Sequence, residues 1–310
     1  MADVKFVVLL AARNWSERLT GKSTVEVCGR PILAHIIDRF KASDRVTDIV
    51  VCTSHRRDDD AIARICRQES VPCHRSDLSE DGDLVALLDE ALQFHAPDAS
   101  YVFRGLTDCV FVEPQFIDWR LDLLERRQAD VVWPGLPQDP WPIYGARESP
   151  WSRRAWDETV RHSKGDETEH PGLFIYQNWR KFRVVYTEML PVEYYRPYRL
   201  ELDTAKDLEV VRALFEALWE PGGIVPMLEA VKWLDAHQDV AALNQNVPLR
   251  SITEVNWHTA RGHTVWRCQK CGATPMLATT IRDRCLETEC PNCGHPQPFV
   301  EVPAFLAERR

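Results

Sequence analysis

The sequence lacks three features that would have placed the protein in a membrane, outside the cell or on nucleic acid. Its longest apolar runs, such as Phe6 to Ala12, fall far short of the roughly 20 residues that a membrane-spanning helix needs. The opening residues have no basic segment and no small-residue cleavage site, so we expect no secretory signal and a cytoplasmic location. Positive charge is not in excess, because the net charge is −9, so we expect no nucleic-acid partner.

Internal repeats and low-complexity tracts are also missing. The hydrophobic fraction of 45% and the charged fraction of 27% are typical of a soluble globular protein, which excludes a disordered or fibrous chain. A chain of 310 residues is long enough for one large domain or two smaller ones. The sequence therefore predicts a globular protein that folds around its own core.

The first two-thirds of the chain alternate between strand-like and helix-like patterns. This alternation predicts an open α/β fold with a mainly parallel sheet and flanking helices. A Pro-rich stretch at 134–150 interrupts it and is typical of a loop or lid. We expect strands at 5–10, 48–52, 101–103, 130–133, 182–188 and 200–202, and helices at 31–40, 58–67, 84–94, 114–127, 204–219 and 225–235.

A cationic loop follows the first expected strand. Within residues 11–22 it carries Arg13, Arg18 and Lys22, together with the hydroxyl of Ser16 and the flexible Gly21. Ligands of open α/β sheets bind at the carboxyl ends of the strands, and these cations suit a polyphosphate. The Walker A spacing is absent. A solvated charged turn remains the alternative interpretation of this loop taken alone.

Two aspartates should reach the same edge of the sheet. Asp108 follows the expected strand at 101–103, and Asp203 ends the expected strand at 200–202. Two carboxylates beside a triphosphate favour Mg²⁺, which takes few protein oxygens and completes its shell with phosphate and water. The alternative is that each is a turn aspartate. Asp207 lies three residues after Thr204, the spacing of a capping box, so we expect it to be structural.

The order of these motifs resembles the sugar cytidylyltransferases, including the 3-deoxy-manno-octulosonate and acylneuraminate enzymes, and especially the spore coat polysaccharide biosynthesis protein F group. The resemblance spans about residues 4–248. It is carried by Ala12-Arg13-x-x-Ser16-x-Arg18-Leu19-x-Gly21-Lys22, Cys28-Gly29-Arg30-Pro31-Ile32-Leu33-x-His35, Val50-Val51-Cys52-Thr53-Ser54, Leu106-Thr107-Asp108-Cys109, Glu169-His170, Leu202-Asp203-Thr204-x-x-Asp207-Leu208 and Ala242-Leu243-Asn244.

The resemblance implies a glycosyltransferase-A type, Rossmann-like nucleotide-binding fold and a set of site residues. The catalytic residues would be Arg13, Arg18, Lys22, Asp108 and Asp203, with Mg²⁺ on the two aspartates. The nucleotide would contact Ala11, Ala12, Arg13, Ser16, Arg18, Lys22, Ser54, Arg75, Thr107 and Asp108. The sugar would contact Tyr144, Glu148, Glu169 and His170. Thr107 stands where the family usually has glycine, so its side chain should narrow the nucleotide pocket or alter the turn.

Four cysteines near the C-terminus have the spacing of a zinc site. Cys268-x-x-Cys271 and Cys290-x-x-Cys293 are separated by 18 residues, and a glycine follows the second cysteine of each pair. Four thiolates close the tetrahedron, so we expect a structural Zn²⁺. With six Lys or Arg and five Asp or Glu after residue 261, the ribbon is not basic. A protein partner is therefore expected for it rather than nucleic acid.

The sequence thus predicts a nucleotidyltransferase domain at 1–249, a linker at 250–264 and a zinc ribbon at 265–310. The expected reaction is the Mg²⁺-dependent transfer of CMP from CTP to a sugar or sugar acid, with release of pyrophosphate, in polysaccharide biosynthesis. Two alternatives remain at this point: a glycosyltransferase that uses a nucleotide sugar, and a non-catalytic adaptor that displays the ribbon. The residues nominate no general base, name no particular sugar and leave a homodimer open.

Overall fold

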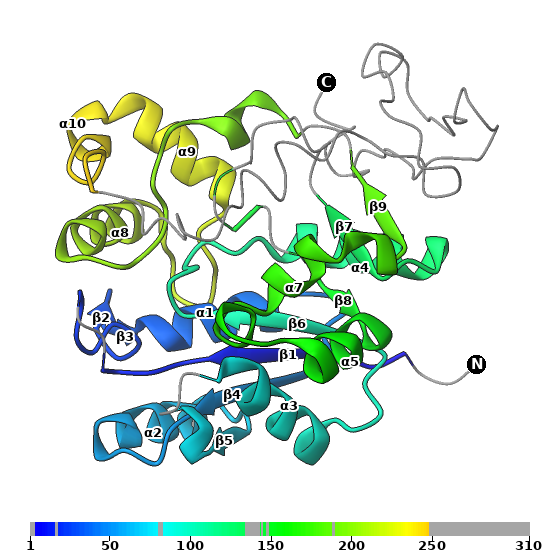
Figure 1. Ribbon diagram of the computed structural model, residues 1–310. Helices are drawn as coiled ribbons and strands as arrows, with labels where there is room; N and C mark the ends of the chain where they lie inside the picture. The colour runs from blue at the N-terminus through cyan, green and yellow to red at the C-terminus, as the bar shows by residue number, and fades with distance from the viewer. Residues whose placement is uncertain are drawn as a thin grey trace, which may run out of the picture.

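A mixed β-sheet forms the centre of the molecule (Figure 1). The computed structural model describes residues 4–15, 18–79, 83–133, 143, 145–146, 149–187 and 190–247. Within these ranges the main sheet has the strand order β5-β4-β1-β6-β8-β7-β9, and β2 and β3 form a separate hairpin. The strands are β1 (Phe6–Ala11), β2 (Glu26–Val27), β3 (Arg30–Pro31), β4 (Asp48–Thr53), β5 (Cys73–Arg75), β6 (Tyr101–Leu106), β7 (Val131–Trp133), β8 (Trp151–Ser152) and β9 (Val184–Tyr186).

The larger part of this sheet is parallel. β1 pairs in parallel with β4 on one side and β6 on the other, and β4 pairs in parallel with β5. The short strand β8 runs antiparallel to both β6 and β7, and β7 pairs in parallel with β9. The predicted α/β fold with a mainly parallel sheet is confirmed. The carboxyl ends of β1, β4 and β6 therefore lie along one edge of the sheet.

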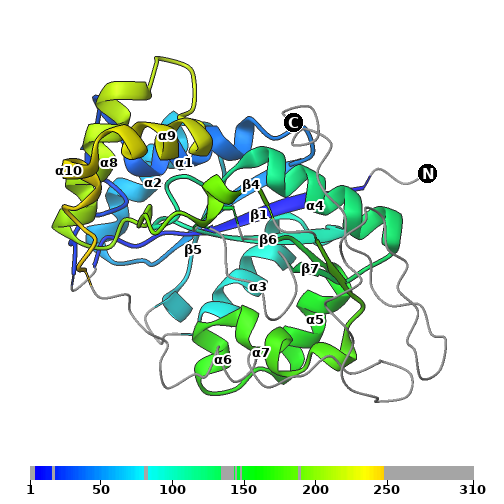
Figure 2. The same cartoon turned by 90° about the horizontal axis from the view of Figure 1, so that it is seen from above.

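Helices cover both faces of the sheet (Figure 2). α1 (Ile32–Lys41), α2 (Asp60–Gln68), α4 (Pro114–Arg127), α8 (Ala205–Leu218) and α9 (Met227–Ala236) lie on one side. α3 (Leu84–His95) and α5 (Arg153–His162) lie on the other. The shorter helices are α6 (Asp166–Glu169), α7 (Pro171–Gln177), α10 (Gln238–Ala241), and the 3₁₀ turns η1 (Arg57–Asp59), η2 (Asp77–Ser79), η3 (Trp179–Lys181) and η4 (Val192–Tyr195).

Strand β1 shows why the core has two layers. Phe6, Val8 and Leu10 pack into one buried cluster with α1, α2, α4 and α8, whereas Val7 and Leu9 pack into a second cluster with α3 and α5. All five side chains are fully buried. Successive side chains of a strand point to opposite faces, so a continuous apolar run is what a strand covered on both faces requires.

The sequence located most of the elements that carry the site, but one predicted strand is wrong. Residues 200–202 form no strand; a single hydrogen bond from the Leu202 amide to the Asp108 carbonyl, 2.9 Å long, holds the segment beside the sheet. One bond of this kind fixes the position of the chain without forming a ladder. The expected helix after it is present as α8.

Some parts of the sequence interpretation are not tested by the structure, and some elements of the structure were not predicted. The predicted linker at 250–264 and ribbon at 265–310, with Cys268, Cys271, Cys290 and Cys293, lie outside the described residues, and the domain boundaries stay predictions. The sequence analysis gave no element between residues 151 and 181, where the structure has β8, α5, α6 and α7. Among the described residues, no helix is both long and apolar enough to cross a membrane.

Candidate functional site

The loop after β1 is folded tightly onto itself. Gly21 has a φ of +72°, a conformation that favours glycine, and its amide donates to the Asn14 carbonyl at 2.7 Å. Its own carbonyl accepts from the amides of Thr24 and Val25 at 2.9 Å. Ala11 is the last residue of β1, and the amide of the buried Ala12 donates to the Cys52 carbonyl of β4. The start and end of the loop are therefore fixed at the sheet edge.

Lys22 projects from this loop onto two carboxylates. Its Nζ lies 3.2 Å from Oδ1 of Asp203 and 3.7 Å from Oδ2 of Asp108. A third contact joins Nη2 of Arg18 to Oδ2 of Asp203 at 3.1 Å. The Lys22 and Asp203 side chains are each only 13% exposed, so water screens this pair less than a surface ion pair. The structure thus brings together four predicted site residues.

One oxygen of Asp108 has no hydrogen-bond partner among the described residues. In the described part of the chain, no group hydrogen-bonds its Oδ1, although that atom is buried. The Asp108 backbone carbonyl accepts the Leu202 amide, which holds residues 202–203 next to the loop after β6. A buried, unpaired carboxylate oxygen carries a desolvation penalty that a bound ligand can offset. This vacant acceptor beside Asp203 suits a cation that prefers oxygen donors.

Arg199 is a further cation of the cluster. It donates to Oδ1 of Asp207 at 2.8 Å and to Oδ2 of Asp203 at 3.3 Å, and it pairs with Glu201 at 3.1 Å. The sequence analysis missed it; the signal that was available is an arginine followed by acids at 201, 203 and 207. Arg199 is four residues from Asp203 in sequence and orients its carboxylate. Arg18 and Lys22 contact the same carboxylate from the distant loop after β1.

Asp207 is structural, as the capping-box spacing predicted. The Thr204 hydroxyl oxygen accepts from the Asp207 amide, while Oδ2 of Asp207 accepts from the Thr204 amide at 2.8 Å, so α8 begins with a capping box. Burial raises the pKa of Asp207, but Arg199, Thr204 and Asn244 together hold that pKa below its ordinary value. Asn244, which follows α10, donates to Oδ1 of Asp207 at 2.9 Å. This bond ties the chain after α10 to the start of α8.

Thr107 packs beneath the cationic loop. It is only 3% exposed, and the hydroxyls of Thr107 and Ser23 lie 3.3 Å apart. The Ser23 hydroxyl also donates to the Arg13 carbonyl at 3.1 Å. The Thr107 side chain therefore helps to hold the cationic loop on the end of β6.

Ser54 and Arg75 have partners within the protein. The buried Ser54 hydroxyl bonds Oδ2 of Asp59, and Arg75 donates from Nε to the Ser54 carbonyl at 2.8 Å. Arg75 also pairs with Asp60 at 2.8 Å. These contacts fix the turn after β4, and direct contact of either residue with a nucleotide stays a prediction.

Two of the residues predicted for the sugar, Glu169 and His170, are described, and they belong to a part of the fold that supplies no residue of the charged cluster. Glu169 is exposed at the end of α6, and His170 is half-buried between α6 and α7; neither helix supplies a residue of the cluster. Tyr144 and Glu148, together with Ser16 of the loop, lie outside the described residues. Gly145 is described and contributes structurally: its φ is +99°, and a Cβ there would lie 2.6 Å from the Phe111 carbonyl oxygen.

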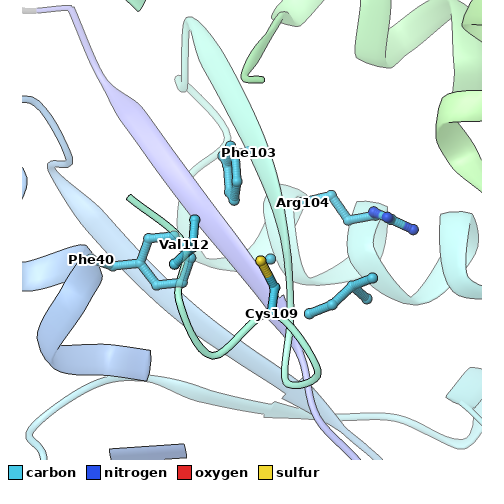
Figure 3. A pocket seen from close by; sticks show the side chains of 7 residues that line it. Phe40, Phe103, Arg104, Cys109 and Val112 are labelled. Atoms are coloured by element: carbon cyan, nitrogen blue, oxygen red, sulfur yellow. The ribbon is translucent and has the colours of Figure 1, made fainter. Parts of the chain in front are cut away.

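A small pocket lies beside β6 but outside the charged cluster (Figure 3). Phe40, Phe103, Cys109 and Val112 gather on one side of the strand, and Arg104 points away on the other. The remaining lining comes from Gly105 and Leu106. Because this lining is mainly apolar and includes none of the cluster's cations or carboxylates, it does not suit a phosphate.

Comparisons with known proteins identify one family. The sequence profile of the cytidylyltransferase family matches residues 7–220. A protein from Methanocaldococcus jannaschii named only as uncharacterised is 27% identical, with 81% of this chain and 99% of the relative covered. A 3-deoxy-manno-octulosonate cytidylyltransferase from Geotalea daltonii is 23% identical, with 74% of this chain and 99% of the relative covered.

Two solved structures share the fold. A cytidylyltransferase from Leptospira borgpetersenii has a TM-score of 0.66 at 18% identity, covering 80% of this chain and 98% of that one. A CMP:2-keto-3-deoxy-manno-octonic acid synthetase complexed with CTP has a TM-score of 0.51 at 16% identity, covering 69% of this chain and 99% of that one. At these identities the similarity establishes a common fold.

Proposed function

Because the chain belongs to the cytidylyltransferase family and is a nucleotidyltransferase, we propose that it transfers CMP from CTP to an oxygen of a sugar or sugar acid. The acceptor oxygen attacks the α-phosphorus, the bond from that phosphorus to the β-phosphate oxygen breaks, and pyrophosphate leaves. The observation that carries the proposal is the contact of Lys22 with Asp108 and Asp203 at the carboxyl edge of the sheet. It combines phosphate-binding and metal-binding groups in one place.

Asp108 and Asp203 are the residues proposed to hold Mg²⁺. The buried Oδ1 of Asp108 without a described partner fits this role, and two carboxylates are enough for an ion that takes its other ligands from phosphate and water. In the described part of the chain, no three His, Cys, Asp or Glu side chains form a metal cluster. Bound there, Mg²⁺ would neutralise phosphate charge and polarise the reacting phosphoryl group.

Arg18 and Lys22 are proposed to exchange partners when the nucleotide binds. Both now contact Asp203, and a triphosphate offers them oxygens of higher charge. Charge-assisted bonds to phosphate fix the position of the ligand as well as binding it. The chain's contribution is then mainly positioning and charge neutralisation, as in other phosphoryl transfers. Arg199 keeps Asp203 oriented during the exchange, because it donates to Oδ2 of Asp203, the oxygen that Arg18 also contacts.

Family membership favours nucleotidyl transfer over the two alternatives. A glycosyltransferase of this fold would be expected to carry an Asp-x-Asp pair at the metal strand, whereas Leu106-Thr107-Asp108 has a single acid. A non-catalytic adaptor would have no need for the cation and carboxylate cluster. The zinc ribbon at Cys268, Cys271, Cys290 and Cys293 remains part of the proposal as a structural module that contacts a protein partner.

A pyrophosphate-release assay tests this function. The protein is incubated with Mg²⁺ and each of CTP, UTP, ATP and GTP, with a panel of acceptors that starts from 3-deoxy-manno-octulosonate because one relative carries that name. The proposal predicts release that depends on both CTP and an acceptor. Acceptor-dependent release with another triphosphate alone would contradict the assignment of CTP.

A further inference from the structure

Two arginines lie over one indole ring beside the cationic loop. The guanidinium carbon of Arg13 is 4.3 Å from the centre of the Trp15 ring, and that of Arg56, from the turn after β4, is 5.4 Å away. Both arginines are exposed. Within the described residues neither forms an ion pair, whereas Arg18 and Lys22 pair with Asp203. Arg13 and Arg56 are thus held over one ring with no counter-charge from the part of the chain that the structure describes.

The backbone around these residues is fixed from both sides. The Asn14 amide donates to Oδ1 of the buried Asp59 at 2.8 Å, and the Asn14 side chain donates to the Asp58 carbonyl at 2.8 Å. The Arg56 amide donates to the Ser54 hydroxyl at 3.1 Å, and the Arg56 carbonyl accepts from Arg75 at 3.0 Å. The loop after β1 and the turn after β4 are therefore locked together before any ligand binds.

This arrangement is costly without an anion. Like charges that share one aromatic ring repel each other, and a cation–π contact at an exposed site is weak. In addition, the buried Nε1 of Trp15 has no acceptor among the described residues. A group with several anionic oxygens would offset the repulsion, and each guanidinium offers a fork of donors to it.

We propose that Arg13, Trp15 and Arg56 form an anion site for the terminal phosphates of the nucleotide and for the pyrophosphate that leaves. The inference rests on the proposed function and adds Arg56 and Trp15 to its site. The Arg13 carbonyl accepts from the hydroxyl of Ser23, the neighbour of Lys22, so the backbone that carries Arg13 is tied to the segment that carries Lys22. Trp15 acts as a positioning residue: it sets the separation of two guanidinium groups that would otherwise move apart.

Calorimetric titration of the full-length protein with inorganic pyrophosphate, at one fixed salt concentration, tests the proposal. Arg56→Gln should weaken pyrophosphate binding by about 5- to 10-fold, because it removes one exposed charge-assisted contact. Arg57→Gln is the matched control: it removes the same charge from the adjacent exposed residue, which in the described part of the chain does not lie over the Trp15 ring, and it should change binding less than twofold. Equal effects of the two variants would overturn the proposal.

Substitution of Trp15 separates a positioning role from a general charge effect. Trp15→Leu keeps every charge and should still weaken pyrophosphate binding, whereas Trp15→Phe retains an aromatic face and should recover most of it. Thermal unfolding of each variant checks that the fold is intact. Unchanged binding in a folded Trp15→Leu variant would contradict the positioning role.

The test also distinguishes this site from the proposed function. If wild-type protein makes CMP-sugar while Arg56→Gln binds pyrophosphate normally, the anion site is wrong and the function stands. If pyrophosphate binds through Arg56 but no acceptor and CTP give a product, the anion site stands and the function is wrong.

Discussion

Nζ of Lys22 lies 3.2 Å from Oδ1 of Asp203, across 181 residues of chain. One of these residues belongs to the loop after the first strand, and the other immediately precedes the capping box of α8. Their contact joins two distant parts of the chain in one charged cluster. A nucleotide that binds there must compete with this contact. Substitutions of Lys22 and of the carboxylates should therefore both change nucleotide binding or turnover.

Replacing Lys22 with methionine should weaken CTP binding by about 10- to 150-fold, since a hydrogen bond to a charged group contributes about 1.5–3 kcal/mol. CMP binding should weaken less, because Lys22 is proposed to face the outer phosphates. Equilibrium titration with each nucleotide measures the difference. Lys206→Met, which removes the same charge from an exposed position on α8, is the control and should leave both affinities near wild type. Equal losses for CTP and CMP would place Lys22 elsewhere on the ligand.

Asp108→Asn should lower Mg²⁺-dependent turnover by at least about 100-fold, because it keeps the size of the side chain and removes a proposed metal ligand. The midpoint of thermal unfolding should change little. Initial rates at several Mg²⁺ concentrations provide the measurement, and Asp239→Asn on α10 controls for the change in net charge. Combined with Lys22→Met, the losses should be non-additive because both residues act on one ligand. Full activity of Asp108→Asn would show that Asp108 is a turn residue.

Comparison of the sequence with the structure shows which features local patterns encode. The continuous apolar run of β1 and the helical spacing of α1 and α4 depend on nearby residues, and all three elements were predicted. Strand β8 has two residues and exists only because β6 and β7 pair with it. Periodicity gives no signal for such a strand.

Some residues of the candidate site can likewise be predicted from local sequence patterns, whereas others depend on tertiary contacts. The cationic loop and Asp108 were located from sequence because they follow predicted strands. Asp203 was also placed near Asp108, although the strand expected before it is absent and one backbone hydrogen bond takes its place. Arg199 and Arg56 were missed because their roles depend on tertiary contacts with Asp207 and Trp15.

His35 should make stability depend on pH. Burial lowers the pKa of this histidine, only partly opposed by its hydrogen bond to the Val27 carbonyl, where Nε2 lies 2.9 Å from the oxygen. The neutral ring therefore donates from Nε2 and packs edge-on to Phe215 and Trp219. Since the folded-state pKa lies below the unfolded value of about 6.5, the unfolded chain binds more protons there. The stabilising contribution is present above pH 6.5 and is lost as the pH falls towards the folded-state pKa.

Denaturant unfolding between pH 7.5 and pH 5 measures this effect. One such group contributes a slope of at most about 1.4 kcal/mol per pH unit. His35→Gln should be less stable at pH 7.5 but should lose less stability on acidification, and His55→Gln, at an exposed position, is the control. Identical pH slopes for wild type and His35→Gln would refute the assignment.

Purified protein should contain about one equivalent of zinc per chain, bound by Cys268, Cys271, Cys290 and Cys293. Elemental analysis measures the content. Cys268→Ser should lose the metal and leave pyrophosphate binding unchanged, because the sheet domain is proposed to have a separate core. Cys66→Ser, at a buried cysteine of α2, is the control for loss of a thiol and should retain zinc. A zinc-free protein in which two of the four thiols form a disulfide would contradict the ribbon.

The most direct measurement is mass spectrometry of the acceptor after incubation of the full-length protein with CTP, Mg²⁺ and a panel of sugar acids. The account predicts a product whose mass is that of one acceptor joined to CMP with loss of water, formed together with an equal amount of pyrophosphate. The Asp108→Asn protein should form this product at least about 100-fold more slowly. An acceptor that gains a sugar from a nucleotide sugar, with no CMP adduct formed from CTP, would contradict the account.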